Sequence, residues 1–245
     1  MFHFFERKKF LVDYLEGFVD IHNHILPGID DGAKTVDESI ALIKGFSEFG
    51  VTNFIATPHI IHNYYPNSPE SIGSSLMILK NELLKRDMKA VSIRAAAEHM
   101  IDDNFESILE SNAILPLGNN NLLVEMSYLQ ASINFEEAIQ KIKHHGYFPI
   151  LAHPERYLYL YNNFKKHKTY KKEGVRYQLN LLSLGNYYGY EVQQMAFKLL
   201  KKGMIDYVGS DIHNQIQLTN IKKVELTEKT LNYLKPILRN TNCSF

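Results

Sequence analysis

Apolar and polar positions follow two alternating periodicities along the chain. Short apolar runs typical of buried strands are followed by longer segments in which apolar residues recur with helical spacing. This alternation predicts parallel strand pairing, with both sheet faces covered by helices or the sheet closed into a barrel. The expected strands are Phe18–His22, Asn53–Thr57, Ser92–Ala97, Leu122–Glu125, Phe148–Ala152, Tyr177–Leu181 and Tyr207–Gly209. The clearest expected helices are Val36–Phe49, Pro69–Lys85, Phe135–His145, Glu191–Lys201 and Val224–Leu234.

Local capping signals agree with these helices. Gly50, Gly146 and Gly203 each follow a helical run, where a left-handed C-terminal cap favours glycine. Thr35 precedes another helical run and has Glu38 three residues later, which is a capping-box pattern.

The seven expected strands favour an α/β fold of the TIM-like (β/α)7 barrel type, and an open doubly wound sheet is the alternative. The sequence has neither a G-x-G-x-x-G turn after the first strand nor a G-x-x-x-x-G-K-[ST] loop, so the motifs of dinucleotide and ATP binding are missing. We expect residues 18–245 to form one barrel domain, because no linker divides them. For the N-terminal extension, residues 1–17, an amphipathic helix packed on the barrel is favoured over a membrane-surface anchor.

Composition and charge narrow the class of protein further. Apolar residues make up 45% of the 245 residues, which is enough for a substantial core. Lys and Arg together number 27, and so do Asp and Glu, so the chain lacks the basic excess of a nucleic-acid binder. No apolar run approaches the roughly 20 residues of a membrane span, and the N-terminus lacks the apolar core of a signal peptide. We therefore expect a cytoplasmic enzyme without nucleic-acid partners or stable membrane insertion.

The cysteine content excludes one phosphatase mechanism. Cys243 is the only cysteine, so no intramolecular disulfide can form, as is typical of a reducing compartment. A cysteine-dependent phosphatase needs a phosphate-binding loop with an arginine directly after the thiolate, and only Ser244 and Phe245 follow Cys243. We expect the chemistry to come from other residues.

Side chains that can bind metals follow six of the seven expected strands. The C-terminal ends of parallel strands converge at one mouth of a barrel, and alternate strand residues, such as His22 and His24, point the same way. Each motif alone is weak, but several carboxylates buried together are costly unless a cation neutralises them. The set therefore predicts a metal site at that mouth. Its segments are His22-Asn23-His24, Asp30-Asp31-Gly32, Thr57-Pro58-His59, Ala97-Glu98-His99, Val124-Glu125-Met126, His153-Pro154-Glu155-Arg156 and Ser210-Asp211-Ile212-His213.

These segments, within residues 20 to 214, resemble the PHP (polymerase and histidinol phosphatase) superfamily. Asp30-Asp31-Gly32 and His153-Pro154-Glu155-Arg156 are most similar to its manganese-dependent protein tyrosine phosphatases of capsule and exopolysaccharide operons. The resemblance implies a distorted (β/α)7 barrel of the PHP type and hydrolysis of phosphotyrosine by attack of a metal-bound hydroxide, without a phosphoenzyme. The implied partner is a phosphotyrosine protein, the tyrosine-rich tail of a membrane-associated capsule tyrosine kinase.

The resemblance also implies three divalent metal ions, with Mn²⁺ preferred. Imidazole and carboxylate ligands without thiolate suit Mn²⁺, Fe or Zn²⁺, and closely spaced ions can activate water for an in-line displacement. The family pattern favours Asp31 over Asp30 as a ligand. The implied ligands are His22, His24, Glu98 and Asp211 for the first ion, Glu98 (as a bridge), Glu125 and His153 for the second, and Asp31, His59 and His213 for the third.

Arg156 is expected to act in catalysis with Asp211 and Glu98, as a bidentate donor that binds the phosphate. The alternative role for Arg156 is a salt bridge with Glu155 or a contact at the start of a helix. Tyr157 is a candidate for substrate binding, because it begins an aromatic stretch that could stack on a phosphotyrosine ring, and core packing is the alternative.

In one respect the sequence departs from the phosphatase subgroup. A second arginine is common there a few residues after the Asp-x-His motif, and Leu218 stands at that place here, with Lys222 or Lys223 as possible substitutes.

Several other polar residues carry weaker signals. His99 is expected to pack on the opposite side of its strand from Glu98, and Asn180 to bond near the site or within a turn. His62 follows the site in a loop and is expected to be exposed, as are four further histidines, namely His3, His144, His145 and His167.

Three other functions remain open. A small-molecule phosphatase acting on a substrate such as histidinol phosphate is the nearest alternative. A polymerase-associated exonuclease is disfavoured by the balanced charge and the lack of a further domain. A non-catalytic phosphopeptide-binding module is disfavoured because all nine candidate ligands are present. The sequence does not indicate an oligomeric state.

Overall fold

The computed structural model describes residues 8–245, and strands alternate with helices along most of this range. The strands are β1 (Lys9–Phe10), β2 (Val19–Asp20), β3 (Asn53–Ala56), β4 (His59–Ile60), β5 (Ser92–Ala95), β6 (Glu98–Met100), β7 (Asn121–Glu125), β8 (Phe148–Ala152), β9 (Arg176–Asn180), β10 (Tyr207–Gly209) and β11 (Glu225–Leu226). The α-helices are α1 (Val36–Ser47), α2 (Pro69–Lys85), α3 (Phe105–Glu110), α4 (Phe135–His144), α5 (Phe164–Lys172), α6 (Tyr190–Lys201), α7 (Gln215–Ile221) and α8 (Glu228–Ser244). Four short 3₁₀ helices are η1 (Leu11–Tyr14), η2 (Pro154–Arg156), η3 (Leu158–Leu160) and η4 (Leu181–Leu184).

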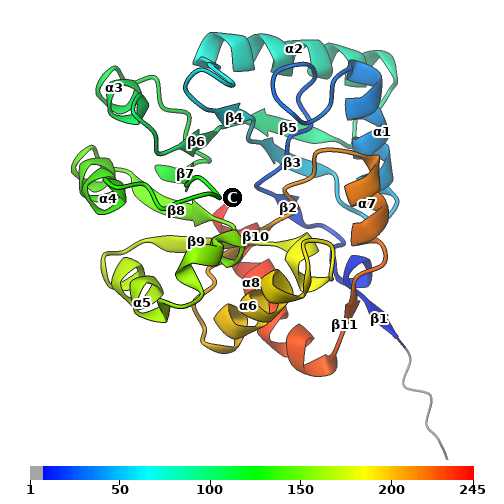
Figure 1. The fold of residues 1–245 in the computed structure, drawn as a ribbon. Coiled ribbons are helices and arrows are strands. Elements are labelled where there is room, and N and C mark those ends of the chain that lie inside the picture. The colour runs from blue at the N-terminus through cyan, green and yellow to red at the C-terminus, as the bar shows by residue number, and fades with distance from the viewer. Residues whose placement is uncertain (1–7) are drawn as a thin grey trace, which may run out of the picture.

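The central strands pair in parallel within two sheets, in the orders β2-β3-β5 and β10-β9-β8-β7-β6-β4. The two sheets share two chain segments, because β4 follows β3 after two residues and β6 follows β5 in the same way. The two sheets of the mixed α/β fold therefore follow one another and curl around a common centre, with helices outside them (Figure 1).

Hydrogen bonds also link the first and last parallel strands just beyond their ends. Asn23 and Ile212 form an isolated parallel bridge. The Asp211 amide donates to the His22 carbonyl at 2.7 Å, and the His24 amide donates to the Ile212 carbonyl at 2.9 Å. Residues almost 190 positions apart in sequence are thus neighbours at the end of the sheet where both segments carry site residues.

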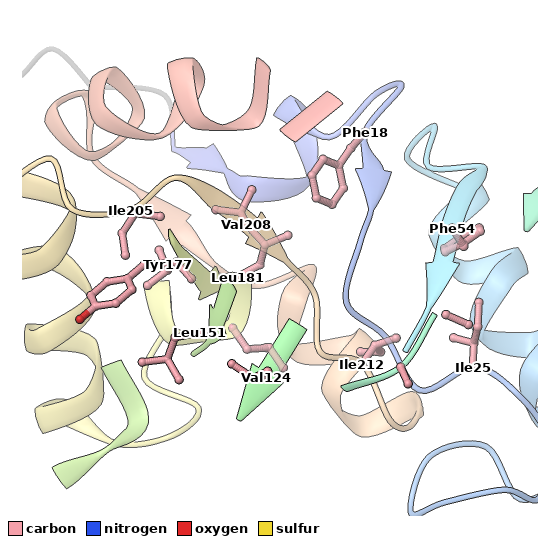
Figure 2. Packing of buried hydrophobic residues seen from close by; sticks show 14 of the residues in the cluster. Phe18, Ile25, Phe54, Val124, Leu151, Tyr177, Leu181, Ile205, Val208 and Ile212 are labelled. Atoms are coloured by element: carbon pink, nitrogen blue, oxygen red, sulfur yellow. The ribbon is translucent and has the colours of Figure 1, made fainter. Parts of the chain in front are cut away.

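The buried side chains of the strands fall into an inner and an outer cluster, as expected when successive residues point to opposite faces. On β8, Ile150 and Ala152 belong to the inner cluster, whereas Leu151 belongs to the outer one. The outer cluster packs between strands and helices, and Figure 2 shows part of it, including Val124 and Leu151 of neighbouring strands. The inner cluster fills the concave side of the curled sheet.

The inward register continues from this apolar layer into the candidate site. Glu125 follows inner Leu123 by two residues, and Glu98 follows inner Ala96 in the same way. Residues two apart in extended backbone point to the same side. The carboxylates of Glu98 and Glu125 therefore lie on the inner side, next to these apolar residues.

Most expected elements are confirmed, with shifts of a few residues at their ends. All seven expected strands are present, and α2, β8 and β10 have the expected bounds. The C-terminal cap glycines Gly50, Gly146 and Gly203 have φ values of 81°, 81° and 63°. The Thr35 hydroxyl accepts a hydrogen bond from the Glu38 amide at the start of α1.

The expected helix Val224–Leu234 is wrong at its beginning. Residues Glu225–Leu226 form β11, which pairs antiparallel with β1, and the helix begins only at Glu228. Thr227 ends the strand and caps α8, because its hydroxyl accepts from the Thr230 amide.

The helix expected over residues 1–17 is also wrong for the residues of this range that the structure describes. Residues 8–17 contain β1 and the single 3₁₀ turn η1, and residues 1–7 lie outside the described part. Among the helices of residues 8–245, none has the length and apolar character needed to span a membrane.

Candidate metal centre

Glu98 occupies the centre of the cluster formed at the strand ends. It is fully buried, and its register partner on the neighbouring strand is His59. Four imidazoles surround its two oxygens. Oε2 lies 3.2 Å from His22 Nε2, 3.4 Å from His24 Nε2 and 3.1 Å from His59 Nδ1, and Oε1 lies 3.0 Å from His153 Nε2.

Asp211 borders the same cluster with one oxygen and contacts other residues with the second. Its Oδ1 lies 3.5 Å from His22 Nε2 and 3.3 Å from His24 Nε2. Its Oδ2 accepts from Arg156 Nη1 at 2.8 Å and from Asn180 Nδ2 at 2.7 Å. The backbone of Asp211 has φ 52°, a conformation uncommon for a residue other than glycine, and its bond to His22 helps to hold it there.

A second, more exposed group of side chains surrounds Asp31. The Asp31 Oδ1 atom is 3.5 Å from His59 Nε2 and 3.4 Å from His213 Nε2. His24 joins this group, since its ring stacks on that of His213 with centroids 3.9 Å apart. Asp30 points elsewhere, because its carboxylate contacts His24 Nδ1 at 2.7 Å and accepts from the Gly32 and His59 amides.

The donor atoms form three overlapping groups whose members lie within 4.8 Å of one another. The first contains His22, His24, Glu98 and Asp211, the second His59, Glu98 and Glu125, and the third His24, Asp31, His59 and His213. His153 adjoins the second group, with Nε2 3.9 Å from Glu125 Oε2. All nine candidate ligands from the sequence therefore converge on one place, and the groups could hold metal ions.

Two observations indicate that the cluster is suited to bind cations. Glu98 Oε2, Glu125 Oε1 and His59 Nδ1 are buried without a hydrogen-bond partner among the described residues, although each faces the cluster. The second is an outer contact made by three of the five imidazoles, those of His22, His24 and His213. His22 Nδ1 contacts Gln178 Oε1 at 2.6 Å, so it carries the proton and leaves Nε2 toward the cluster. Such contacts are typical of metal-binding histidines, whose other nitrogen is held by a carbonyl or carboxylate oxygen.

The electrostatics of the cluster also indicate a need for positive charge. Burial disfavours the charged form of Glu98, but His22 and His59 outweigh it and hold the pKa of this carboxyl well below its usual value. Burial lowers the pKa of His24, but Asp30, Asp211 and Glu98 together raise it well above its usual value. The raised pKa values of His22, His24 and His59 thus reflect the negative charge of the carboxylates around them.

Arg156 lies at the edge of the cluster, at the end of η2. Its partner is Asp211, and the alternative salt bridge with Glu155 is not formed. Glu155 is instead fully buried, and its Oε1 accepts from the Asn180 amide at 3.0 Å and from the Ser183 hydroxyl at 2.7 Å. This carboxylate anchors the turn that carries both His153 and Arg156.

Tyr157 does not form an open wall of the site, contrary to its predicted role in substrate binding. It is fully buried, and its hydroxyl accepts from the Met126 amide at 3.0 Å. The ring that reaches the surface beside the cluster is Tyr128, which is 43% exposed and whose hydroxyl lies 3.2 Å from His153 Nε2. Core packing, the alternative for Tyr157, is confirmed.

The place of the missing second arginine is also accounted for. Leu218 is buried in α7 against α1, where a Cβ on Gly45 would come within 2.3 Å of it, so a charged side chain would not fit there. Lys222 pairs with Glu48 at 2.5 Å on the outside of the molecule and does not substitute at the site.

The weaker histidine and asparagine predictions have mixed outcomes. His99 is buried against Phe105 and the Leu123 carbonyl, as expected, and Asn180 both contacts Asp211 and closes a turn at Leu182. His62, His144 and His145 are exposed, and His3 lies outside the described residues. His167 is not exposed, contrary to expectation: it is fully buried beside the Tyr177 hydroxyl.

A curled parallel α/β sheet with overlapping imidazole and carboxylate groups at one end defines a class of candidate metalloprotein. A family model described as "Capsular polysaccharide synthesis, CpsB/CapC" matches residues 18–231, and the chain belongs to this family. This confirms the family-level resemblance to phosphatases of capsule operons.

Relatives and a solved structure agree with the family. The putative tyrosine-protein phosphatase CapC of Staphylococcus aureus is 28% identical over 226 residues, which cover 89% of this chain and 88% of CapC. The tyrosine-protein phosphatase YwqE of Bacillus subtilis is 28% identical over 197 residues, which cover 80% of this chain and 77% of YwqE. One chain from the crystal structures of YwqE and of CpsB from Streptococcus pneumoniae, described as unique metal-dependent tyrosine phosphatases, has a TM-score of 0.77 and 26% identity and covers 91% of this chain and 94% of its own length.

Proposed function

We propose that this protein is a metal-dependent protein tyrosine phosphatase that acts in the control of capsular or exopolysaccharide synthesis. The observation that carries the proposal is the three overlapping donor groups bordered by the Arg156 guanidinium. The proposal is also supported by the family of the chain, because relatives in it are named tyrosine-protein phosphatases.

We propose further that the curled sheet is a distorted (β/α)7 barrel of the PHP type. Seven parallel chain segments follow one another around the sheet, and the backbone bonds at His22 and Ile212 join the first to the last. In such a barrel the ligand end would be the usual position of an active site.

Three divalent ions, with Mn²⁺ preferred, fit the residues present. His22, His24, Glu98 and Asp211 would hold the first, Glu98, Glu125 and His153 the second, and Asp31, His59 and His213 the third, with His59 also within reach of the second. When bound, divalent ions would neutralise the charge of a phosphate ester and lower the pKa of water. The Glu98 and Glu125 oxygens that lack a hydrogen-bond partner would then bind a cation.

The chain's own residues would bind and orient the ester. Arg156 would donate hydrogen bonds to the phosphate from N–H groups that Asp211 does not occupy. Asn180 would hold Asp211 in place through its bond to Oδ2. A phenolate, whose parent pKa is near 10, leaves without a dedicated general acid more readily than an alkoxide does, which favours phosphotyrosine over an alkyl phosphate.

The proposed partner is the tyrosine-rich tail of a membrane-associated capsule tyrosine kinase. We propose the cytoplasm as the compartment, for which the support is the single cysteine typical of a reducing environment.

The test is a substrate panel with the full chain and Mn²⁺. The panel contains a phosphotyrosine peptide, histidinol phosphate and single-stranded DNA. We expect hydrolysis of the peptide, with at least a hundredfold loss of kcat/KM in Asp211→Ala and in Arg156→Ala, since the first removes a proposed metal ligand and the second removes the proposed hydrogen-bond donor to the phosphate. The matched controls Asp103→Ala and Arg239→Ala change exposed residues outside the cluster and should leave turnover unchanged.

Each other outcome has a clear meaning. Preferential hydrolysis of histidinol phosphate would favour the small-molecule phosphatase. Tight binding of the peptide without hydrolysis would favour the non-catalytic binding module. Equal activity of Asp211→Ala and the parent would contradict the proposed site.

A further inference from the structure

The guanidinium of Arg156 lies between two tyrosine rings. Its Cζ atom is 4.5 Å from the ring centroid of Tyr128 and 4.3 Å from that of Tyr188. Tyr128 comes from the loop after β7, and Tyr188 from the loop between η4 and α6. Three segments far apart in sequence therefore meet at one cation.

This arrangement restricts how Arg156 can meet a ligand. A planar guanidinium has two faces and a set of N–H groups along its edges. Both rings lie within cation–π distance of Cζ, and Nη1 donates to Asp211 at 2.8 Å. The two rings and Asp211 thus occupy much of the surroundings of the guanidinium, and a phosphate would bind to the N–H groups that they leave free.

The two rings are themselves held in place. The Tyr128 ring stacks on buried Tyr157 with centroids 5.9 Å apart, and its hydroxyl contacts His153 Nε2. The Tyr188 hydroxyl accepts from Asn180 Nδ2 at 3.4 Å, and the same amide group donates to Asp211 Oδ2. The frame that surrounds Arg156 is thus connected to proposed metal ligands on both sides.

A cation between aromatic faces is also favoured energetically. Each such contact contributes more when the cation is shielded from water, and the Arg156 side chain is only 21% exposed. Burial alone would lower the pKa of Arg156, but Tyr128 and Asp211 are among the neighbours that raise it, so the group stays charged.

We propose that Tyr128 and Tyr188 are positioning residues that hold the Arg156 guanidinium edge-on to the phosphate of the substrate. The inference rests on the proposed function, and it assigns the effect to the aromatic faces, with the hydroxyl groups secondary. It concerns two residues that would act through Arg156.

The test compares substitutions at Tyr188, whose ring is not bonded to a predicted ligand. Tyr188→Phe keeps the aromatic face, whereas Tyr188→Leu keeps apolar bulk without it. We expect Phe to retain kcat/KM on a phosphotyrosine peptide within about twofold, and Leu to lower it roughly 5- to 30-fold, with a similar rise in the inhibition constant of inorganic phosphate. Tyr190→Leu, on an exposed tyrosine of α6, is the matched control and should behave like the parent.

A double-mutant cycle separates positioning from a general structural role. In an Arg156→Ala background, Tyr188→Leu should cause no further loss, because the group that Tyr188 positions is gone. Tyr128→Phe and Tyr128→Leu should repeat the pattern. An equal loss with and without Arg156, or an equal loss for Phe and Leu, would overturn the inference.

Failure of the proposed function would look different. In that case the parent would not hydrolyse phosphate esters, and the same variants would be compared by calorimetric binding of inorganic phosphate to the Mn²⁺-loaded protein. Weaker phosphate binding in the Leu variants alone would support the positioning role, and equal binding in all variants would overturn it.

Discussion

At the scale of single residues, the Asp211 carboxylate joins two parts of the site. Its Oδ1 faces the imidazoles of His22 and His24, and its Oδ2 faces Arg156 and Asn180. Burial disfavours the charged form, but His22, His24 and Arg156 are among the neighbours that hold the pKa of Asp211 well below its usual value. One carboxylate therefore fixes the position of Arg156, the proposed hydrogen-bond donor to the phosphate, relative to the proposed metal ligands.

Asp30 should affect metal binding without being a ligand. Its carboxylate holds His24 Nδ1 at 2.7 Å and accepts from the His59 amide at 3.1 Å, so it orients two proposed ligands. We expect Asp30→Ala to lower the affinity for Mn²⁺ about 10- to 100-fold, as for other residues that orient metal ligands, and Asp30→Asn to lower it less. Titration calorimetry with Mn²⁺ measures this, with Asp103→Ala as the control. An unchanged affinity in Asp30→Ala would contradict the orienting role.

His167 should make folding sensitive to acid. Burial, with a smaller contribution from Lys198, lowers the pKa of His167 to about 4, so the folded protein keeps this imidazole neutral. The unfolded chain binds a proton near pH 6.5. The contribution of His167 is therefore fully present above pH 6.5 and is lost as the pH falls from 6.5 toward 4.

A substitution isolates this contribution. Between pH 7.5 and 5.0, His167→Gln should lose roughly 1–2 kcal/mol less of its free energy of unfolding than the parent loses. Urea denaturation at the two pH values measures the difference, and His144→Gln, on an exposed histidine, should follow the parent. Parallel losses in parent and His167→Gln would show that the native pKa is not lowered.

Sequence reasoning recovers the candidate ligands better than the residues around them. Most of the candidate ligands lie at or just beyond strand ends, where the period of two and the parallel order determine direction, whereas Asp31 lies in the loop after β2; all nine converge. Tyr128 and Tyr188 lie in loops, for which no periodicity predicts a direction. The alternation of aromatic and aliphatic residues that begins at Tyr157 does not show whether a ring is buried or exposed. In the structure the Tyr157 ring is fully buried.

At the scale of elements, the turn after β8 shows how backbone shape serves the site. His153 has φ 34°, and the chain then forms η2 with Arg156 at its end. The buried Glu155 carboxylate ties this turn to Asn180 and Ser183 at the end of the neighbouring strand, and the Tyr161 hydroxyl donates to the Glu155 carbonyl at 2.7 Å. The uncommon conformation of His153 is thus maintained by bonds on either side of it.

The loop that carries Asp30 and Asp31 should not tolerate a side chain at Gly32. A Cβ there would lie 2.0 Å from the His24 carbonyl oxygen and 2.5 Å from the His24 Cβ, so the loop must move away from a proposed ligand. We expect Gly32→Ala to lower the free energy of unfolding by about 2 kcal/mol or more and to reduce the metal content. Thermal denaturation and metal analysis of the purified protein measure both effects.

Gly73 provides the matched control. It lies inside α2, and a Cβ there would meet nothing within 4 Å. Gly73→Ala should therefore stabilise the protein by roughly 0.5–1 kcal/mol, because alanine favours the helix. Similar stability of the two variants would contradict the close packing at Gly32.

Among elements, length decides what the sequence predicts. The 17 residues of α2 repeat the helical period often enough to be recognised, and Pro69 and Ser68 mark its start. α3 and α7 have six and seven residues, too few for a clear period. The helix expected from Val224 begins only at Glu228, because Glu225–Leu226 pair with β1 as a strand, a contact between distant segments that local periodicity does not predict.

At the scale of the whole molecule, the joining of the first and last strand segments depends on a few polar contacts. The alternation of strands and helices predicts a parallel sheet but does not determine whether it closes, because an open sheet has the same pattern. Asp20, fully buried on β2, accepts from the Ser210 amide at 2.9 Å and from the Ser210 hydroxyl at 2.6 Å, across 190 positions of sequence. Asp20 lies two residues before His22, and Ser210 lies directly before Asp211. The same contacts therefore also align these two proposed ligands.

Removal of the Asp20 carboxylate should therefore weaken the whole fold. Asp20→Ala would leave the buried Ser210 amide without an acceptor and the hydroxyl with only its longer bond of 3.3 Å to the His22 carbonyl, and we expect the free energy of unfolding to fall by about 2–4 kcal/mol. Asp20→Asn keeps one acceptor oxygen and should lose less.

Because Ser210→Ala removes the hydroxyl donor, its effect and that of Asp20→Ala should not add, and the coupling in urea denaturation should reach about 1 kcal/mol or more. Ser74→Ala, on the exposed face of α2, should change stability by less than about 0.5 kcal/mol. Additive effects of Asp20→Ala and Ser210→Ala would mean that the two strand segments are held together by the backbone bonds at Asn23 and Ile212 alone.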